Sequence, residues 1–123
     1  MYSAAELRAL TDVLLRHPQV WILSDEIYAP FCYSGQSHAS PVQVEPQLIP
    51  RTLIVNGMSK SYAMTGWRIG YGAGPGDLIK AMSTVMSQST SCPSAISQVA
   101  AQAALEGDQS SVTQMVDLSL IHI

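Results

Sequence analysis

The sequence predicts an α/β fold, a partial three-layer sheet that is incomplete. Helical patterns alternate with short strands that are apolar on every side, as expected for strands covered by helices on both faces. We find three candidate strands, at residues 20–23, 52–55 and 68–73. Three strands make too small a sheet to be covered by helices on both faces, so we expect part of a domain rather than a whole one.

The composition is that of a globular protein. The chain has 123 residues, of which 47% are apolar and 12% charged. A net charge of -3 with six Lys and Arg gives no basic surface for nucleic acid or for an anionic membrane. No apolar run of about 18 residues is present, and the first residues lack the pattern of a signal peptide. We therefore expect a cytoplasmic protein without nucleic-acid or membrane partners.

The cysteines and histidines do not form a metal-binding pattern. Cys32 and Cys92 stand outside any CxxC pair, which favours two reduced thiols over a zinc site or a disulfide. His17, His38 and His122 are far apart and lack the spacing of helical metal ligands. We interpret them as surface or loop histidines and expect no metal.

The first helix is the most strongly marked element. Ser3 followed by Glu6 forms a capping box, and an apolar stripe at Leu7, Leu10 and Leu14 follows at helical spacing. These features predict a helix over residues 4–16. The apolar strand at 20–23 comes next and ends at the polar residues 24–26.

The remaining segments have weaker signals. Four prolines with scattered Ser and Gln make residues 30–51 a long surface connection. Asp77 is a candidate cap for a helix whose core-facing residues would be Leu78, Ile79, Met82, Val85 and Met86. Ser94 is expected to cap a helix over 95–105 that ends before Gly107.

Polar residues follow two of the strands, at the positions where ligands collect in open α/β sheets. Asp25 and Tyr28 follow one strand, and Ser59 and Lys60 follow another. A lysine in a partly desolvated pocket has a lowered pKa and attacks carbonyl groups to form an imine. Taken alone, Lys60 could equally be a solvated loop residue, and Asp25 could be a helix cap or a turn residue.

The sequence around these residues resembles the fold-type I pyridoxal-phosphate aminotransferases, in particular the aspartate aminotransferase branch. The likeness is carried by residues 25–28 (DEIY), 56–60 (NGMSK) and 65–71 (TGWRIGY), and it extends over residues 2 to about 115. It implies that residues 1–116 are a fragment of the large, cofactor-binding domain. Residues 117–123 do not resemble the family and are interpreted as a tail or truncation stub.

The resemblance implies a role for each polar residue. Lys60 would form the Schiff base to pyridoxal 5'-phosphate and move the proton during catalysis. Asp25 would keep the pyridine nitrogen protonated, and Tyr28 would donate a hydrogen bond to the ring oxygen. Arg68 would bind the phosphate, with Ser59 assisting. Asp25 and Lys60 must then lie on the same side of the sheet, close enough to flank one ring.

The implied activity is transfer of an amino group between an amino acid, aspartate or a relative, and a 2-oxo acid. Residues 89–94 resemble the loop that reaches the partner subunit in the family, which implies a homodimer, although Cys92 departs from the expected asparagine. Two alternatives remain open. The same residues would serve another enzyme of this fold, such as a carbon-sulfur lyase, or the non-catalytic sensor domain of a transcription regulator.

Overall fold

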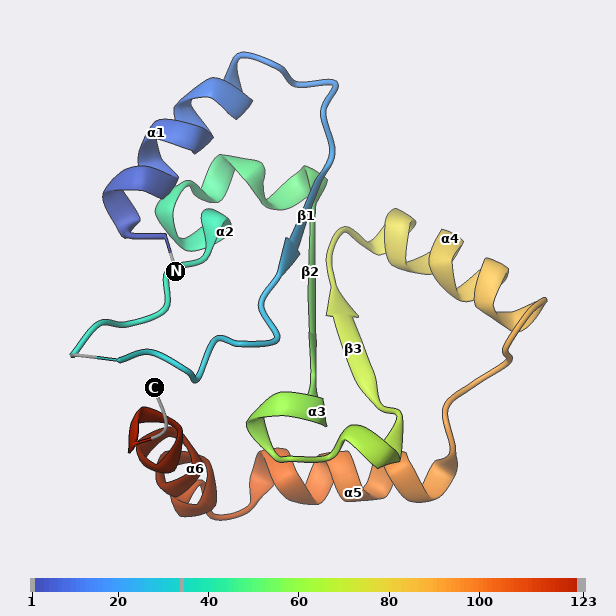
Figure 1. Cartoon of the computed structure of the whole chain (residues 1–123). Helices are drawn as coiled ribbons and strands as arrows, with labels where there is room; N and C mark the ends of the chain where they lie inside the picture. Colours follow the sequence, from blue (N-terminus) through green and yellow to red (C-terminus); the bar gives the residue numbers. More distant parts are fainter. Residues whose placement is uncertain (1, 34, 122–123) are drawn as a thin grey trace.

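The centre of the structure is a three-stranded mixed sheet. The computed structural model describes residues 2–33 and 35–121, and within them the strands are β1 (Ile22–Asp25), β2 (Thr52–Gly57) and β3 (Gly70–Ala73). The strand order is β1-β2-β3, with β1 parallel and β3 antiparallel to β2. As a result the ends of β1 and β2 and the start of β3 lie at one edge of the sheet (Figure 1).

All three predicted strands are present, with shifted boundaries. In β1 the pairing starts at Ile22 and continues into the polar residues, since Asp25 pairs with Val55. In β2 it continues to Gly57, which lies opposite Gly70. The close approach of the strands requires glycine here, because a Cβ added at Gly57 would lie 3.2 Å from the Gly70 Cα.

Helix α1 (Ala4–Leu15) confirms the predicted capping box. The backbone N–H of Ser3 donates to the Glu6 carboxylate at 2.8 Å, and the Glu6 N–H donates to the Ser3 hydroxyl at 3.3 Å. At the other end, the Arg51 guanidinium donates to the carbonyls of Leu14, His17 and Val20. These bonds satisfy carbonyls at the end of α1 and tie that end to the start of β2.

The segment 30–51 is more ordered than a surface connection, and that expectation was wrong for its second half. It contains helix α2 (Pro41–Val44) and the 3-10 helix η1 (Pro46–Arg51). Leu48 within η1 is completely buried. Pro41 and Pro46 begin these two helices, where the missing N–H costs nothing, instead of breaking them.

The strands and helices are not covered on all sides, which confirms the expectation of an incomplete sheet. The side chain of Leu23 in β1 is 64% exposed, and α4 (Gly76–Ser87) has no buried residue. In particular Met82, Val85 and Met86 are exposed. Asp77 lies inside the first turn of α4, and Pro75 occupies the cap position instead. Open apolar faces of this kind are typical of an incomplete domain.

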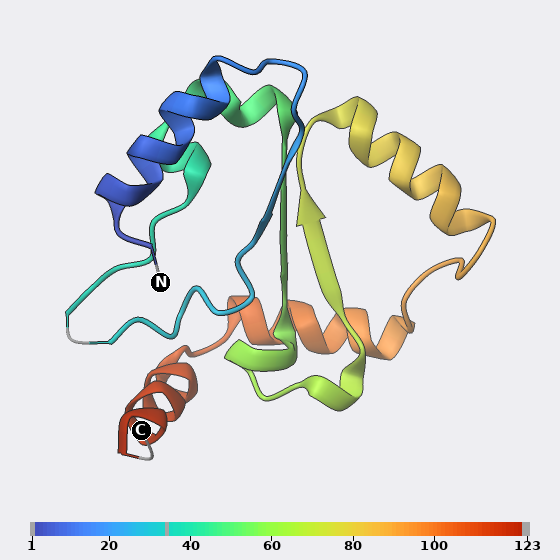
Figure 2. The same cartoon turned by 45° about the horizontal axis from the view of Figure 1, so that its top comes forward.

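The helices lie around the sheet without closing it. In Figure 2, as in Figure 1, α1 lies on one side of the strands and α4 on the other. Helix α5 (Ala95–Glu106), which ends at Gly107 as expected, lies near α3 (Met58–Ser61). Its N-cap Ser94 makes no side-chain capping bond, contrary to the expected cap.

The last helix, α6 (Ser110–Ile121), runs through residue 117 without a break. The division of the chain at residue 117 therefore stays a prediction from the sequence, and His122 lies outside the described residues. No helix in the described part of the chain has the length and apolarity needed to cross a membrane.

Candidate active site

Two chain segments enter the candidate site from neighbouring strands. Asp25 is the last residue of β1, and the next N–H, that of Glu26, donates to the Val55 carbonyl of β2 at 2.9 Å. Lys60 belongs to the short helix α3, which begins directly after β2. Because β1 and β2 are parallel and adjacent, the turn after one and the helix after the other begin at the same edge of the sheet.

The Lys60 amine lies over the Tyr28 ring across this edge. The Lys60 Nζ lies 5.8 Å from the centroid of the Tyr28 ring, within the range of a cation–π interaction. The Tyr28 ring also packs edge-on against Phe31, with centroids 6.1 Å apart. Tyr28 is 56% exposed, so much of the residue is accessible to a ligand.

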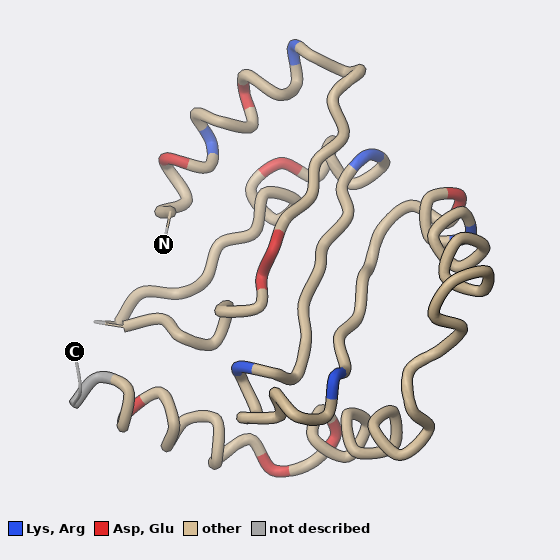
Figure 3. Tube along the Cα trace, turned by 45° about the vertical axis from the view of Figure 1, so that its right-hand side comes forward, with Lys and Arg blue, Asp and Glu red and all other residues tan. Residues whose placement is uncertain are grey.

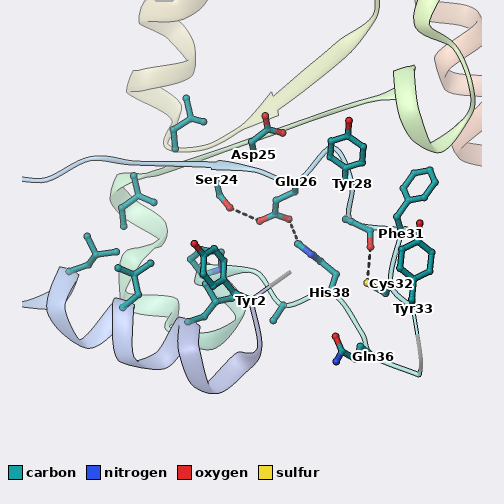
Figure 4. A pocket seen from close by; sticks show the side chains of 18 of the residues that line it. Tyr2, Ser24, Asp25, Glu26, Tyr28, Phe31, Cys32, Tyr33, Gln36 and His38 are labelled. Carbon is teal, nitrogen blue, oxygen red and sulfur yellow. Dashed lines mark hydrogen bonds and ion pairs between the residues drawn. The ribbon is translucent and has the colours of Figure 1, made fainter. Parts of the chain in front are cut away.

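Asp25 lies on the same side of β1 as Tyr28. Figure 4 shows the Asp25 carboxylate and the Tyr28 ring projecting to one side of the chain, whereas Ser24 and Glu26 project to the other. The Asp25 Oδ1 accepts a hydrogen bond from the Ile27 N–H at 3.2 Å. Asp25 thus faces the same side as Tyr28, the residue whose ring lies near the Lys60 amine.

Arg68 and Ser59 are connected through Thr65. The Arg68 guanidinium donates to the Thr65 carbonyl at 2.9 Å, and the Thr65 hydroxyl donates to the Ser59 carbonyl at 3.2 Å. Figure 3 shows the cationic segment in α3 and the one just before β3 at the same end of the sheet. The edge thus carries an amine and a guanidinium from one strand connection and a carboxylate and a phenol from the other.

A pocket of about 860 Å³ lies beside this edge, between α1, β1 and the segment that follows β1. Asp25 and Tyr28 are among its lining residues, but Lys60 and Arg68 lie outside it. Its polar centre is a carboxylate, Glu26, with His38 beside it (Figure 4). This pocket therefore includes only part of the predicted site.

The sequence analysis missed the environment of Glu26. His38, interpreted there as an ordinary surface or loop histidine, is half-buried, and its Nε2 lies 3.1 Å from the Glu26 Oε2. Ser40 is buried and donates to the Glu26 Oε1 at 2.5 Å. The available signal was weak, since a Glu followed by a distant His and Ser has no characteristic spacing.

Comparison with known proteins identifies the family. The model of the family described as aminotransferase class I and II matches residues 1–120. The chain belongs to this family.

Two curated aminotransferases show how close the likeness is. The aspartate aminotransferase of Rhizobium meliloti is 61% identical over 108 residues, which are 88% of this chain and 26% of that protein. The aspartate aminotransferase of Geobacillus stearothermophilus is 53% identical over 115 residues, which are 94% of this chain and 29% of that protein.

Solved aminotransferase structures contain the same arrangement of elements. The crystal structure of the Rhizobium meliloti aspartate aminotransferase superposes with a TM-score of 0.92 at 56% identity, covering 94% of this chain and 29% of that one. The aromatic aminotransferase from Pyrococcus horikoshii superposes with a TM-score of 0.89 at 32% identity, covering 95% and 31%. The chain thus spans 26% to 31% of the lengths of these relatives. The fold is that of part of an aspartate aminotransferase-like domain.

Proposed function

We propose that this chain is the central part of the cofactor-binding domain of a pyridoxal-phosphate-dependent aminotransferase. The complete enzyme would transfer an amino group between an amino acid, aspartate or a close relative, and a 2-oxo acid. The observation that carries the proposal is the contact between the Lys60 amine and the Tyr28 ring at the edge where β1 and β2 both end.

The residues at this edge fit the chemical groups of pyridoxal phosphate. When bound, the cofactor supplies an aldehyde for imine formation and a positively charged ring that accepts the electrons of a carbanion. Lys60 is the amine that would hold the aldehyde carbon and carry the proton to and from the substrate α-carbon. Asp25 would hold a proton at the ring nitrogen, because an anion there stabilises the positive ring.

The other groups would orient the ring. Tyr28, an exposed residue whose ring lies near the Lys60 amine, would donate a hydrogen bond to the ring oxygen. Arg68 would bind the phosphate through the guanidinium nitrogens that are not bonded to Thr65, with Ser59 as a second ligand. The link from Arg68 through Thr65 to Ser59 supports a shared role for the two residues.

The names of the similar proteins favour transamination over the alternatives. A carbon-sulfur lyase or a sensor domain would use the same four side chains, but relatives at 48% to 61% identity include aspartate and aspartate/prephenate aminotransferases. The same names support aspartate as the substrate class. We further propose that the complete enzyme is a cytoplasmic homodimer.

Visible absorbance of the complete enzyme tests the assignment of Lys60. We expect the purified enzyme to absorb visible light through its lysine-bound cofactor and the Lys60→Ala variant to lose this band and its transaminase activity. Lys80, the other lysine of the chain, is exposed on α4 and provides the matched control. A Lys60→Ala variant that keeps the band, or a Lys80→Ala variant that loses it, would refute the assignment.

A further inference from the structure

We propose that Glu26 is a positioning residue for the cofactor ring, acting through Asp25 and Tyr28 on either side of it in the sequence. The inference rests on the proposed function, because it concerns how the ring-binding residues are oriented. Glu26 itself projects to the opposite side of β1 and touches none of the predicted cofactor ligands (Figure 4).

The Glu26 side chain accepts two hydrogen bonds and lies beside an imidazole. Its Oε1 accepts hydrogen bonds from the hydroxyls of Ser24 at 3.1 Å and Ser40 at 2.5 Å. Its Oε2 lies 3.1 Å from the His38 Nε2. The Glu26 side chain is 10% exposed and that of His38 is 25% exposed. A carboxylate so removed from water is stable only when it accepts hydrogen bonds, so the two hydroxyl groups bonded to Oε1 fix its position.

Two hydrogen bonds of the Glu26 backbone connect the fixed residue to the segments that hold Asp25 and Tyr28. Its N–H donates to the Val55 carbonyl at 2.9 Å, which extends the pairing of β1 and β2 past Asp25. Its carbonyl accepts a hydrogen bond from the Ala29 N–H at 2.9 Å, which closes the turn that carries Tyr28. The Glu26 residue is therefore the junction between the strand that ends in Asp25 and the turn that presents Tyr28.

The contacts also join this junction to a distant part of the chain. Ser40 is the N-cap residue of α2, and its carbonyl accepts hydrogen bonds from the Gln43 and Val44 N–H groups. The hydrogen bond from Ser40 thus connects Glu26 to the first turn of a helix. Side chains that bind a ligand keep their orientation when the residues behind them are held by such contacts.

Glu45 provides a matched control for a purely structural effect. Its side chain is also 10% exposed, and it also combines an ion pair, with Arg8 at 2.7 Å, with a hydrogen bond from the Gln47 backbone. It lies between α2 and η1 and contacts neither the Asp25 strand nor the Tyr28 turn through these bonds. Glu45→Gln therefore removes a comparable buried charge without disturbing the junction.

The experiment compares Glu26→Gln with Glu45→Gln in the complete enzyme. We expect Glu26→Gln to raise the cofactor dissociation constant about tenfold, the lower end of the loss seen when groups that orient metal-binding side chains are removed. We also expect it to change the circular dichroism of the bound cofactor relative to its absorbance. Glu45→Gln should lower the melting temperature and leave both cofactor readouts at their wild-type values.

Ser40→Ala is the milder variant in case Glu26→Gln does not fold. It removes one hydrogen bond from the same carboxylate and should shift both cofactor readouts in the same direction by a smaller amount. The inference is overturned if the variants at positions 26 and 40 melt earlier but bind cofactor as the wild type does. Failure of the proposed function would look different, since then the wild type itself would show no cofactor band that depends on Lys60.

Discussion

Arg68 combines the charge needed for phosphate binding with an unusual backbone conformation. Its φ of 52° and ψ of 47° lie in the left-handed region, which non-glycine residues seldom adopt. The guanidinium donates to the Thr65 carbonyl within the same turn. We interpret this conformation as one that the surrounding turn maintains in order to direct the side chain.

Replacing Arg68 by Lys should show whether phosphate binding needs only a positive charge or also the planar shape of the guanidinium. Lysine keeps the charge but loses the planar pair of donors, so we expect the dissociation constant of pyridoxal phosphate to rise about tenfold. Binding of pyridoxal, which lacks the phosphate, should be unchanged. Fluorescence titration with both compounds measures the difference, and Arg16→Lys, on the exposed end of α1, is the control. Equal losses for the two compounds would argue against a phosphate contact.

Glu45 is expected to make stability depend on pH. A hydrogen bond from the Gln47 backbone, followed by the side chain of Arg8, lowers the pKa of Glu45 from its ordinary value of 4.5, against the raising effect of burial. Because the folded state prefers the ionised form, the stabilisation is complete above pH 4.5 and is lost as the pH falls through the lowered pKa.

Melting curves of wild type and Glu45→Gln across this pH range test the sign. The wild type should have the higher melting temperature near neutral pH. The difference in melting temperature between the wild type and Glu45→Gln should shrink as the pH drops below 4.5. A gap that stays constant, or that widens in acid, would contradict this explanation.

At the scale of secondary structure, the contact between β2 and β3 depends on glycine at their facing ends. A Cβ at Gly57 would lie 3.2 Å from both the Gly70 Cα and the Ile69 carbonyl oxygen, and neither backbone atom can move without shifting β3. This shift would reach Arg68 and α3, which lie on either side of the contact.

Gly57→Ala should therefore lower both stability and cofactor binding. We expect a loss of about 1–3 kcal/mol in the free energy of unfolding and weaker binding, measured by chemical denaturation and by titration with pyridoxal phosphate. Gly66→Ala is the control, since a Cβ there meets nothing within 4 Å. If both variants behave alike, the close approach of the strands is not what requires glycine.

Elements with local signals were predictable, and those that depend on distant contacts were not. The capping box of Ser3 and Glu6 defined α1, and the apolar run at the start of β2 defined that strand. The prolines that begin α2 and η1 were misinterpreted, because Leu48 becomes buried only when η1 packs in the fold.

In the candidate site, too, some features were predictable from the sequence and others depend on contacts between distant residues. The proximity of Lys60 to the residues after β1 followed from the rule that ligands collect where parallel strands end. The contacts of Glu26 with His38 and Ser40 bring together residues without a common period or motif. Only the folded chain reveals that these three residues meet.

At the scale of the whole molecule, too little apolar surface is buried for a stable independent domain. The buried apolar residues of the described part are Leu7, Leu48, Leu53, Met58 and Ala101. Large side chains on β1, α4 and α5 are exposed instead, among them Leu23 at 64%, Val85 at 69% and Ile96 at 73%. The open faces are those expected where the rest of a large domain would pack.

The isolated 123-residue chain should therefore behave as a partly folded protein. We expect it to bind the dye ANS, to associate at micromolar concentration and to melt without a sharp transition. Calorimetry and sedimentation of the purified chain measure these properties, with the complete enzyme as the reference. A cooperative, monomeric melt of the isolated chain would contradict this expectation.

The central claim is that the Lys60 amine holds the cofactor at the edge shared by β1 and β2, and covalent trapping tests it most directly. Reduction of the complete enzyme with borohydride, followed by peptide mass spectrometry, locates the lysine that was bonded to the cofactor. We expect the added pyridoxyl-phosphate mass on the peptide that contains Lys60 and none on the peptide that contains Lys80. Finding the mass on any other lysine of the enzyme, with Lys60 unmodified, would contradict the claim.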